Sequence, residues 1–181
     1  LKGIDIRKFG SGNVGATNAL RVLGRGAGIT VLLLDILKGF IVVFFLGNLL
    51  MSRMTGISDT AARILLGLSC IAGHNWTVFL KFKGGKGMAA TLGVLFGLAT
   101  KVAGLKIILG LVLLTWILVF IIFRIVSLAS ILATIALPIY MILFKQPNIL
   151  IFSSIILAIF ICLRHKSNLK RLIQGKEPRL L

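Results

Sequence analysis

Acidic side chains are scarce in this sequence, which has 4 Asp and Glu against 21 Lys and Arg among its 181 residues. The acids are Asp5, Asp35, Asp59 and Glu177, and they lie far apart along the chain. Magnesium sites and two-metal sites are built from clustered carboxylates. The sequence therefore predicts no metal site, and we expect no bound cofactor.

Cysteine is scarce as well, because only Cys70 and Cys162 are present and both lie inside apolar runs. They lack the CxxC spacing of redox or metal sites, so we interpret them as small core residues. A signal-peptide pattern is also missing. The chain starts at Leu1, already close to a polar motif, so we expect an upstream segment that could contain a whole spanning helix.

Apolar residues dominate the composition, at 58% of the chain with a mean hydropathy of +1.07. Runs of ~18 or more apolar residues are typical of spanning helices, whereas a membrane barrel needs short alternating segments. The runs here are continuous, without internal repeats or linkers. We predict an all-α integral membrane protein, a polytopic helical bundle forming one domain over residues 1–181. Six spans are expected, at 28–51, 61–80, 88–101, 105–123, 125–144 and 149–163, the third and sixth being short.

The net charge of +17 does not indicate a nucleic-acid partner, because the cations lie between apolar runs rather than on one soluble face. If every span crosses, one face receives fifteen cations and the other five, with Lys38 inside the first span. The positive-inside rule then makes the richer face cytoplasmic. The fifteen are Lys2, Arg7, Lys8, Arg21, Arg25, Lys81, Lys83, Lys86, Arg124, Arg164, Lys166, Lys170, Arg171, Lys176 and Arg179, and the five are Arg53, Arg63, Lys101, Lys106 and Lys145.

The first of three polar segments runs from Gly10 to Asn18 and is followed by Arg21. Closely spaced glycines let a backbone turn tightly and present N–H groups to an anion, and a helix beginning after Gly15 would direct its N-terminus at the same anion. Candidate binding residues are Gly10, Ser11, Gly12, Asn13, Gly15, Thr17, Asn18 and Arg21. A plain polar connector is the alternative. No strand precedes the segment, which disfavours dinucleotide binding.

The second segment runs from Gly73 to Gly87 and ends in the glycine- and lysine-rich group Lys83, Gly84, Gly85, Lys86 and Gly87. The P-loop spacing fails because Met88 follows Gly87. We interpret the group as an anion-binding turn with two ammonium groups. Trp76 fits an aromatic anchor at the membrane interface. His74 fits either a packing residue or a site residue.

The third segment runs from Leu163 to Glu177. One interpretation of this segment is a basic amphipathic helix that lies on anionic lipid. However, His165 and Asn168 are three residues apart and share a helix face, which suits a pair that orients a hydroxyl group.

Two smaller polar groups complete the set. Asp35 and Lys38 lie three apart inside the first span, so they should face the bundle interior, either as a structural pair or as part of a site. Arg124, Ser127 and Ser130 open the fifth span at the predicted cytoplasmic face, where Arg124 could reach a headgroup or a substrate.

In this order, the three segments resemble the three cytoplasmic motifs of the bacterial acyl-phosphate:glycerol-3-phosphate acyltransferase family. The Asp35–Lys38–Gly39 and Arg124–Ser127–Ser130 groups also fit, so the resemblance spans nearly the whole chain. It implies about seven spans, the first being absent here. Asn75 and Trp76 stand where the family commonly has an aromatic residue and a proline, so the resemblance assigns no functional role to either residue.

The resemblance implies transfer of a fatty acyl group from acyl phosphate to the sn-1 hydroxyl of glycerol 3-phosphate, at the cytoplasmic face of the bacterial inner membrane. We expect Ser11 and the glycine loop to hold the donor phosphate, and Arg21 with Lys83 or Lys86 to hold glycerol 3-phosphate. His165 and Asn168 would orient the hydroxyl or the developing oxyanion. The proton acceptor is either His165 or the substrate phosphate. Catalytic candidates are thus His165, Asn168 and Ser11, with Lys38, His74, Arg124 and Ser127 among the binding candidates.

The His-x4-Asp dyad of other glycerolipid acyltransferases is absent, because Phe79 and Lys170 stand at the Asp positions after the two histidines. An acyl phosphate carries its own good leaving group and needs less from the protein. Two rival functions are a transporter or channel for a phosphorylated anion, and a scaffold on anionic lipid. A transporter should show repeats and polar groups at mid-membrane depth, and a scaffold leaves the glycines unexplained.

Overall fold

The computed structural model describes residues 3–52 and 55–180, which form helices joined by turns. Two units divide the chain, one of residues 1–55 and 65–97 and the other of residues 56–64 and 98–181. Helix α4 (Asp59–Asn75) begins in the second unit and ends in the first, whereas α5 (Met88–Ala99) begins in the first and ends in the second. A single domain stays a prediction. Lys2 and Arg53, which entered the predicted charge bias, lie outside the described residues.

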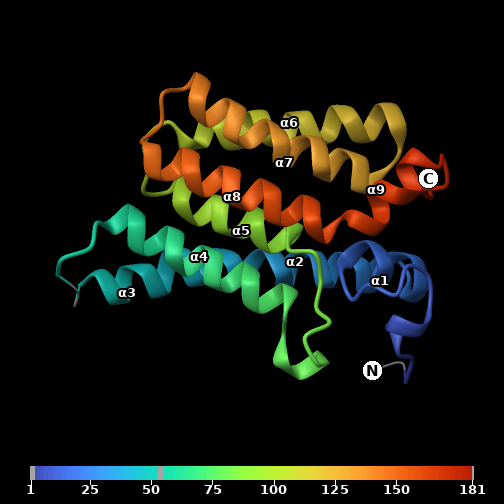
Figure 1. Ribbon diagram of the computed structural model, residues 1–181. Helices are drawn as coiled ribbons and strands as arrows, with labels where there is room; N and C mark the ends of the chain where they lie inside the picture. Colours follow the sequence, from blue (N-terminus) through green and yellow to red (C-terminus); the bar gives the residue numbers. More distant parts are fainter. Residues whose placement is uncertain (1–2, 53–54, 181) are drawn as a thin grey trace. The chain divides into compact units, whose positions relative to one another are not determined.

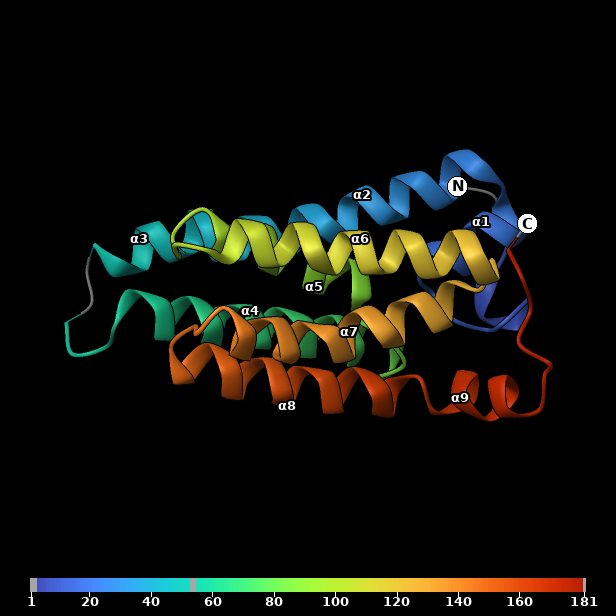
Figure 2. The same ribbon diagram turned by 90° about the horizontal axis from the view of Figure 1, so that it is seen from above.

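The first unit contains one long helix and several short ones. After the 3-10 turn η1 (Ile6–Lys8) and α1 (Ala16–Leu23), α2 (Arg25–Ile41) continues through the π-helical turn η2 (Val42–Leu46) into α3 (Gly47–Met51). Figure 2 shows α2 and α3 as parts of one continuous rod, 27 residues long. A second 3-10 turn, η3 (Val78–Leu80), follows α4.

Glycines allow α2 and α5 to approach each other closely. A Cβ atom on Gly39 would collide with the Ala90 carbonyl oxygen, and one on Gly93 with the Ile36 carbonyl oxygen. Small residues at such contacts let helix backbones pack together in membranes, where no hydrophobic force between helices helps. The opposite side of α2 leaves Leu33 and Leu34 each 58% exposed, as expected of a lipid-facing surface.

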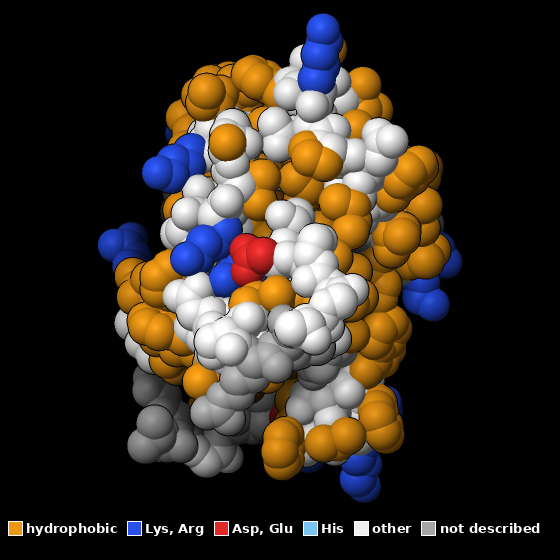
Figure 3. All heavy atoms as spheres, turned by 90° about the vertical axis from the view of Figure 1, so that its left-hand side faces the viewer, with side chains coloured by type: hydrophobic (Ala, Val, Ile, Leu, Met, Phe, Trp, Pro, Cys, Tyr) orange, Lys and Arg blue, Asp and Glu red, His pale blue; other side chains and the backbone are white. Residues whose placement is uncertain are grey.

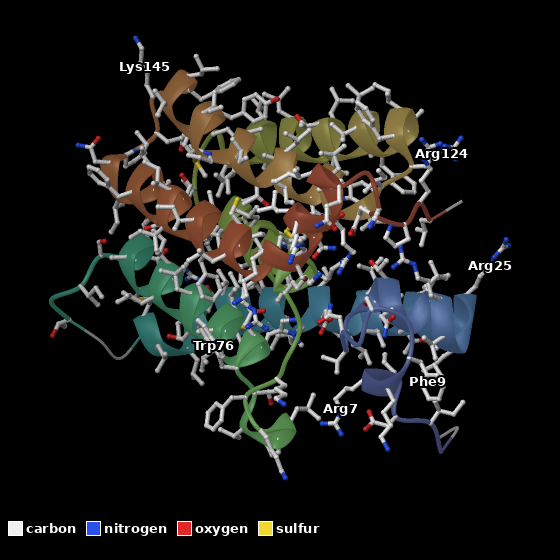
Figure 4. The ribbon with its side chains drawn as sticks, turned by 45° about the vertical axis from the view of Figure 1, so that its right-hand side comes forward. Arg7, Phe9, Arg25, Trp76, Arg124 and Lys145 are labelled. Atoms are coloured by element: carbon white, nitrogen blue, oxygen red, sulfur yellow. The ribbon has the colours of Figure 1, made fainter. Side chains whose placement is uncertain are left out.

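The second unit is a layer of antiparallel helices. Helices α6 (Leu105–Phe123), α7 (Val126–Leu143) and α8 (Asn148–Arg164) lie side by side in chain order (Figure 1), and α9 (Lys166–Ile173) turns away from α8 by 65°. Between α6 and α7, the Thr115 and Tyr140 hydroxyl groups are 2.8 Å apart. Figure 4 shows Arg124 and Lys145 at opposite ends of this layer, so α7 runs from one cationic end to the other.

Each of the six predicted spans coincides with a helical segment, although three are shorter than predicted, the fifth only by one residue at each end. The second ends at Asn75 instead of 80, and the third is 12 residues long. A 12-residue helix is about 18 Å long, too short to cross a hydrocarbon core of ~30 Å by itself. Among the described residues, three helices are long and apolar enough to cross, or four if α8 and α9 form one span. Apolar side chains cover the flanks of the surface in Figure 3, and acidic ones are scarce there.

Candidate active site

Asn18 fixes the shape of the first polar segment. Its Oδ1 accepts a hydrogen bond from the Ser11 N–H (2.9 Å), and its Nδ2 donates to the carbonyl oxygens of Ile6 (3.1 Å) and Phe9 (3.2 Å). The side chain is 1% exposed, so it is a buried amide bonded through both of its polar atoms. Asn18 therefore positions the loop, and its predicted contact with a substrate stays a prediction.

Gly10 and Gly12 are required by this loop because both have left-handed φ values, +59° and +69°. A Cβ atom on Gly10 would also collide with Oδ1 of Asn18. The Gly12 N–H donates to the Phe9 carbonyl oxygen at 3.0 Å, and the Ser11 N–H is held by Asn18. The N–H groups of these two residues are thus used inside the loop.

The start of α1 supplies the remaining N–H groups of this segment that can donate hydrogen bonds to an anion. Gly15 is the N-cap residue, so the N–H groups of Ala16 and Thr17 belong to the first helical turn, which has no intrahelical acceptors for them. The N-terminal end of the helix dipole adds partial positive charge there. Ser11 is exposed beside this turn in sequence, and Arg21 is exposed in the last turn of α1. This segment can therefore offer N–H groups to an anion at the helix start, and the predicted phosphate site stays a prediction.

Three ionisable groups of the first unit meet between α2 and α4. Nζ of Lys38 lies 2.5 Å from Oδ1 of Asp35 and 2.5 Å from Nδ1 of His74, and His74 Nδ1 is 3.5 Å from the same Asp35 oxygen. Their side chains are 15% (Asp35), 37% (Lys38) and 10% (His74) exposed. Charges at membrane depth need such pairing. The ammonium donates to both partners, so Nδ1 of His74 is the acceptor and Nε2 carries the proton of the neutral ring.

The glycines of the second segment are explained by contact with His74. The N–H groups of Gly84 and Gly85 donate to the carbonyl oxygens of Asn75 and His74, each at 3.2 Å. A Cβ atom on Gly84 would collide with the His74 carbonyl oxygen, and one on Gly85 with the His74 ring. We call this backbone pairing the His74–Gly85 clasp. The predicted anion-binding turn is thus, at Gly84 and Gly85, a close-packing arrangement.

The neighbours of the clasp carry the charge of this segment. Lys83 is exposed and Lys86 is half-buried, so Lys83 remains open to an anionic ligand. Gly87 has a left-handed φ of +84°, and a Cβ atom there would lie 3.0 Å from Nδ2 of Asn75. The predicted roles of these lysines stay predictions.

In the second unit, Glu177 ties together residues that are far apart in sequence. Its Oε1 accepts hydrogen bonds from the Ser127 hydroxyl (2.7 Å) and the Asn168 amide (2.6 Å), and its Oε2 accepts from Nε of Arg171 (2.7 Å). The carboxylate is 5% exposed. Burial raises the pKa of Glu177, but the hydrogen bonds from Arg171, Ser127 and Asn168 outweigh it and hold the pKa below its ordinary value.

His165 lies at the bend between α8 and α9, where it is the C-cap of one helix and the N-cap of the other. Its Nδ1 is 2.9 Å from the Ile161 carbonyl oxygen, and the residue is 3% exposed. A carbonyl oxygen only accepts, so Nδ1 carries the proton in this bond. In the neutral ring the lone pair is then on Nε2, which gives His165 the tautomer of a general base.

A family model described as glycerol-3-phosphate acyltransferase matches residues 1–175. This chain belongs to that family. The glycerol-3-phosphate acyltransferase of Gloeobacter violaceus is 42% identical over 99% of this chain and 83% of its own length, and that of Aquifex aeolicus is 41% identical over 99% and 87%. Both relatives are therefore covered over most of their length.

Two solved structures are similar over almost the whole chain. PlsY, an integral membrane glycerol 3-phosphate acyltransferase, matches in its glycerol 3-phosphate form with a TM-score of 0.85 at 38% identity, covering 98% of this chain and 83% of that one. Its lysophosphatidic acid form matches with a TM-score of 0.81 at 37% identity. The predicted all-α integral membrane fold is confirmed. The family also confirms the prediction of an acyltransferase, so the transporter and scaffold readings are not favoured.

The structure of this acyltransferase assigns the predicted site residues to separate groups. Ser11, Asn13 and Thr17 lie at or before the start of α1, Arg21 lies in its last turn, and Lys38 contacts His74. In the second unit, Ser127 and Asn168 share one carboxylate oxygen, while the Arg124 carbonyl oxygen accepts from the Leu180 N–H at 2.9 Å. Ser130 accepts from the Trp116 indole at 3.2 Å and is a packing residue.

Sequence reasoning missed Glu177 and Arg171 as supports of this group. One feature of the sequence could have indicated this role. Glu177 is the only acidic residue after Asp59, and it follows closely spaced polar residues whose N–H and O–H groups need a hydrogen-bond acceptor.

Proposed function

We propose that this acyltransferase moves a fatty acyl group from acyl phosphate to the sn-1 hydroxyl of glycerol 3-phosphate. The hydroxyl oxygen bonds to the acyl carbonyl carbon, and the bond from that carbon to the phosphate oxygen breaks. The products are 1-acylglycerol 3-phosphate, a lysophosphatidic acid, and inorganic phosphate. Crystal forms of PlsY with glycerol 3-phosphate and with lysophosphatidic acid support this pairing of acceptor and product.

The observation that carries the proposal is the hydrogen bond from His165 Nδ1 to the Ile161 carbonyl oxygen. It gives the ring a fixed orientation and leaves Nε2 as the basic nitrogen, in a position that is 3% exposed. A general base needs both features, since proton transfer depends on alignment as well as on basicity. Nε2 or an oxygen of the substrate phosphate accepts the proton of the attacking hydroxyl.

Asn168 and Glu177 assist His165 through their positions in the fold. Asn168 is three residues beyond His165, and its amide is held by Glu177 at 2.6 Å. An amide that is fixed on one side presents its remaining groups without further loss of side-chain entropy, which favours binding of the hydroxyl or the developing oxyanion. The Ser127 hydroxyl is fixed by the same carboxylate.

The first unit supplies phosphate-binding groups. Ser11 and the N–H groups at the start of α1 would hold the phosphoryl group of the donor. The exposed guanidinium of Arg21, with Lys83 or Lys86, would hold glycerol 3-phosphate, because a guanidinium binds a phosphate through two parallel hydrogen bonds. The excess of cations on one predicted face favours the cytoplasmic side of a bacterial inner membrane.

Phosphate release measures the proposed reaction directly. Purified protein in lipid nanodiscs is given palmitoyl phosphate with or without glycerol 3-phosphate, and both inorganic phosphate and lysophosphatidic acid are quantified. We expect the two products in equal amounts, only when the acceptor is present and not with the His165→Ala variant. Phosphate release without acceptor would contradict the proposal, as would acyl transfer from an acyl thioester at an equal rate.

A further inference from the structure

The segment from Trp76 to Lys83, here called the 76–83 projection, extends from the end of α4 (Figure 1, green loop below α4), and several of its apolar side chains are exposed. Phe79 is 91% exposed, Val78 65%, Phe82 61% and Trp76 44%. Neither Phe79 nor Phe82 has a ring contact among those found in the described residues. Such a cluster of large apolar side chains on a turn marks a contact surface.

The backbone of the projection is a hydrogen-bonded turn rather than an extended loop. Phe82 N–H donates to the Thr77 carbonyl oxygen at 2.9 Å, and Lys83 N–H donates to that of Leu80 at 3.1 Å. Lys81 and Phe82 are consecutive and both left-handed, with φ of +52° and +60°. Side-chain-bearing residues adopt this conformation at an energetic cost. The fold thus holds Phe82 outward against a backbone preference, and Phe79 is exposed on the same turn.

We infer that the 76–83 projection inserts into the headgroup and upper acyl region of a membrane containing anionic lipid. Trp and other aromatic residues are enriched at that depth, and lysines there extend their ammonium groups to the headgroups. Lys81 and Lys83 are exposed within the projection, and the sequence has no acid between Asp59 and Glu177 to repel anionic lipid. The occupant of this surface is therefore lipid.

The mixture of exposed apolar side chains and exposed lysines favours lipid over a protein partner. Trp76 follows directly after the end of α4, and Lys81 and Lys83 are exposed beside Val78, Phe79 and Phe82. Trp76 occupies the junction, where an amphipathic ring is expected.

The projection begins and ends at the His74–Gly85 clasp. Within the clasp, the Gly84 N–H donates to the Asn75 carbonyl oxygen at 3.2 Å, and the His74 ring contacts Lys38 and Asp35. Anchoring of the turn in lipid therefore fixes the position of a ring that contacts two charged groups inside the bundle. This inference concerns a binding surface, so it holds whether or not the proposed reaction is correct.

Depth-dependent fluorescence quenching tests the inference. The reporter carries Trp76→Phe, Trp116→Phe and Phe79→Trp, in nanodiscs that contain anionic lipid brominated at shallow or deep acyl carbons. We expect at least twofold stronger quenching by shallow than by deep bromines, and weak quenching by aqueous acrylamide. Leu33→Trp in the same background is the lipid-facing reference. A matching thermal unfolding temperature verifies the fold, and Phe82→Trp replaces Phe79→Trp if that temperature drops.

Two outcomes would overturn the inference. Strong acrylamide quenching without bromine quenching would place the turn in water, and protection from both quenchers would mean that protein covers it. A charge test is independent of these. Lys81→Glu in the reporter should lower shallow-bromine quenching in anionic nanodiscs and leave it unchanged in zwitterionic ones. Equal quenching of both reporters in anionic nanodiscs would contradict the role of anionic lipid.

Discussion

A single hydrogen bond decides the chemistry available to His165. Because Nδ1 donates to the Ile161 carbonyl oxygen at 2.9 Å, removal of the ring removes an oriented base and little ground-state binding. We predict that His165→Ala lowers kcat by ~10²–10⁴-fold with a small change in KM for glycerol 3-phosphate. Steady-state phosphate release measures both constants. A large rise in KM at unchanged kcat would assign His165 to substrate binding instead.

Asn168 should act as a unit with His165, and His165→Ala/Asn168→Ala tests this. We expect the double variant to lose less than the product of the two single losses, because each residue depends on the other to orient the same hydroxyl. The same kinetic assay measures it. Losses that multiply would mean that the two residues act independently.

Glu177 stabilises the folded protein, and this stabilisation depends on pH in a definite direction. Its folded-state pKa lies below the unfolded value of 4.5, so the stabilisation is present above that value and is lost as pH falls through the folded pKa. We predict that Glu177→Gln lowers the free energy of unfolding by about 1.5–3 kcal/mol near neutral pH, the value of hydrogen bonds to a charged group.

The measurement for Glu177 is the thermal unfolding temperature in detergent between pH 7 and about pH 2, a range that extends well below the unfolded pKa. The wild-type temperature should fall more steeply over this range than that of Glu177→Gln, so the two curves converge in acid. The matched control is Glu177→Asp, which keeps the charge but shortens the reach. Parallel curves would contradict a depressed pKa.

At the scale of elements, the contact between the end of α4 and the second glycine segment depends on missing Cβ atoms. We predict that Gly84→Ala disrupts the His74–Gly85 clasp, because the added carbon would collide with the His74 carbonyl oxygen, which cannot move as a side chain can. Gly85→Ala should act similarly through the His74 ring. Overpacking of this kind typically costs about 1–3 kcal/mol.

Gly73→Ala is the control, because a Cβ atom there would meet nothing within 4 Å. Gly73 lies in α4, where alanine is the better helix former by about 1 kcal/mol. Thermal unfolding should therefore rank Gly73→Ala at or above wild type and the two clasp variants below it. An equal loss in all three would show that the whole segment is merely intolerant of change.

The helices themselves could be predicted from the sequence, because long apolar runs have few alternatives in a membrane. The positions at which the helices end could not be predicted. The second apolar run continues through Val78, Phe79 and Leu80, and the prediction therefore extends the helix to residue 80, yet α4 ends at Asn75. The carbonyl oxygens of His74 and Asn75 accept hydrogen bonds from the N–H groups of Gly85 and Gly84, respectively, and no local sequence pattern predicts this pairing.

At the scale of the whole molecule, sidedness is the prediction that joins the polar segments. In a background of Cys70→Ala and Cys162→Ala, we expect Ser11→Cys, Lys83→Cys and Ser167→Cys to react with a membrane-impermeant maleimide only from the cytoplasmic side. Ser58→Cys should react only from the other side. Position 83 suits the label because Lys83 is exposed, whereas Gly85 is buried against His74. Reaction of Lys83→Cys from outside would contradict a common face.

Long-range partners mark the limit of what the sequence predicts for the site. The motifs pointed to His165, Asn168 and Ser127, but the group that joins two of them is Glu177, 50 residues beyond Ser127. A lone acid near a basic stretch looks like an ordinary surface charge. Only the tertiary structure reveals that it is nearly buried and that it accepts three hydrogen bonds.

The continuous rod formed by α2, η2 and α3 has a consequence for the membrane boundary. With 27 residues, it is about 40 Å long, roughly 10 Å more than the hydrocarbon core. Helix α1 packs against its beginning, where a Cβ atom on Gly28 would lie 2.6 Å from that of Leu20. If the excess length is all on the Arg25 side, the helix holds α1 and the loop before it above the acyl chains, within reach of a water-soluble phosphate ester. The hydrophobic mismatch of one helix would thus set the height at which a polar substrate meets a lipid-borne one.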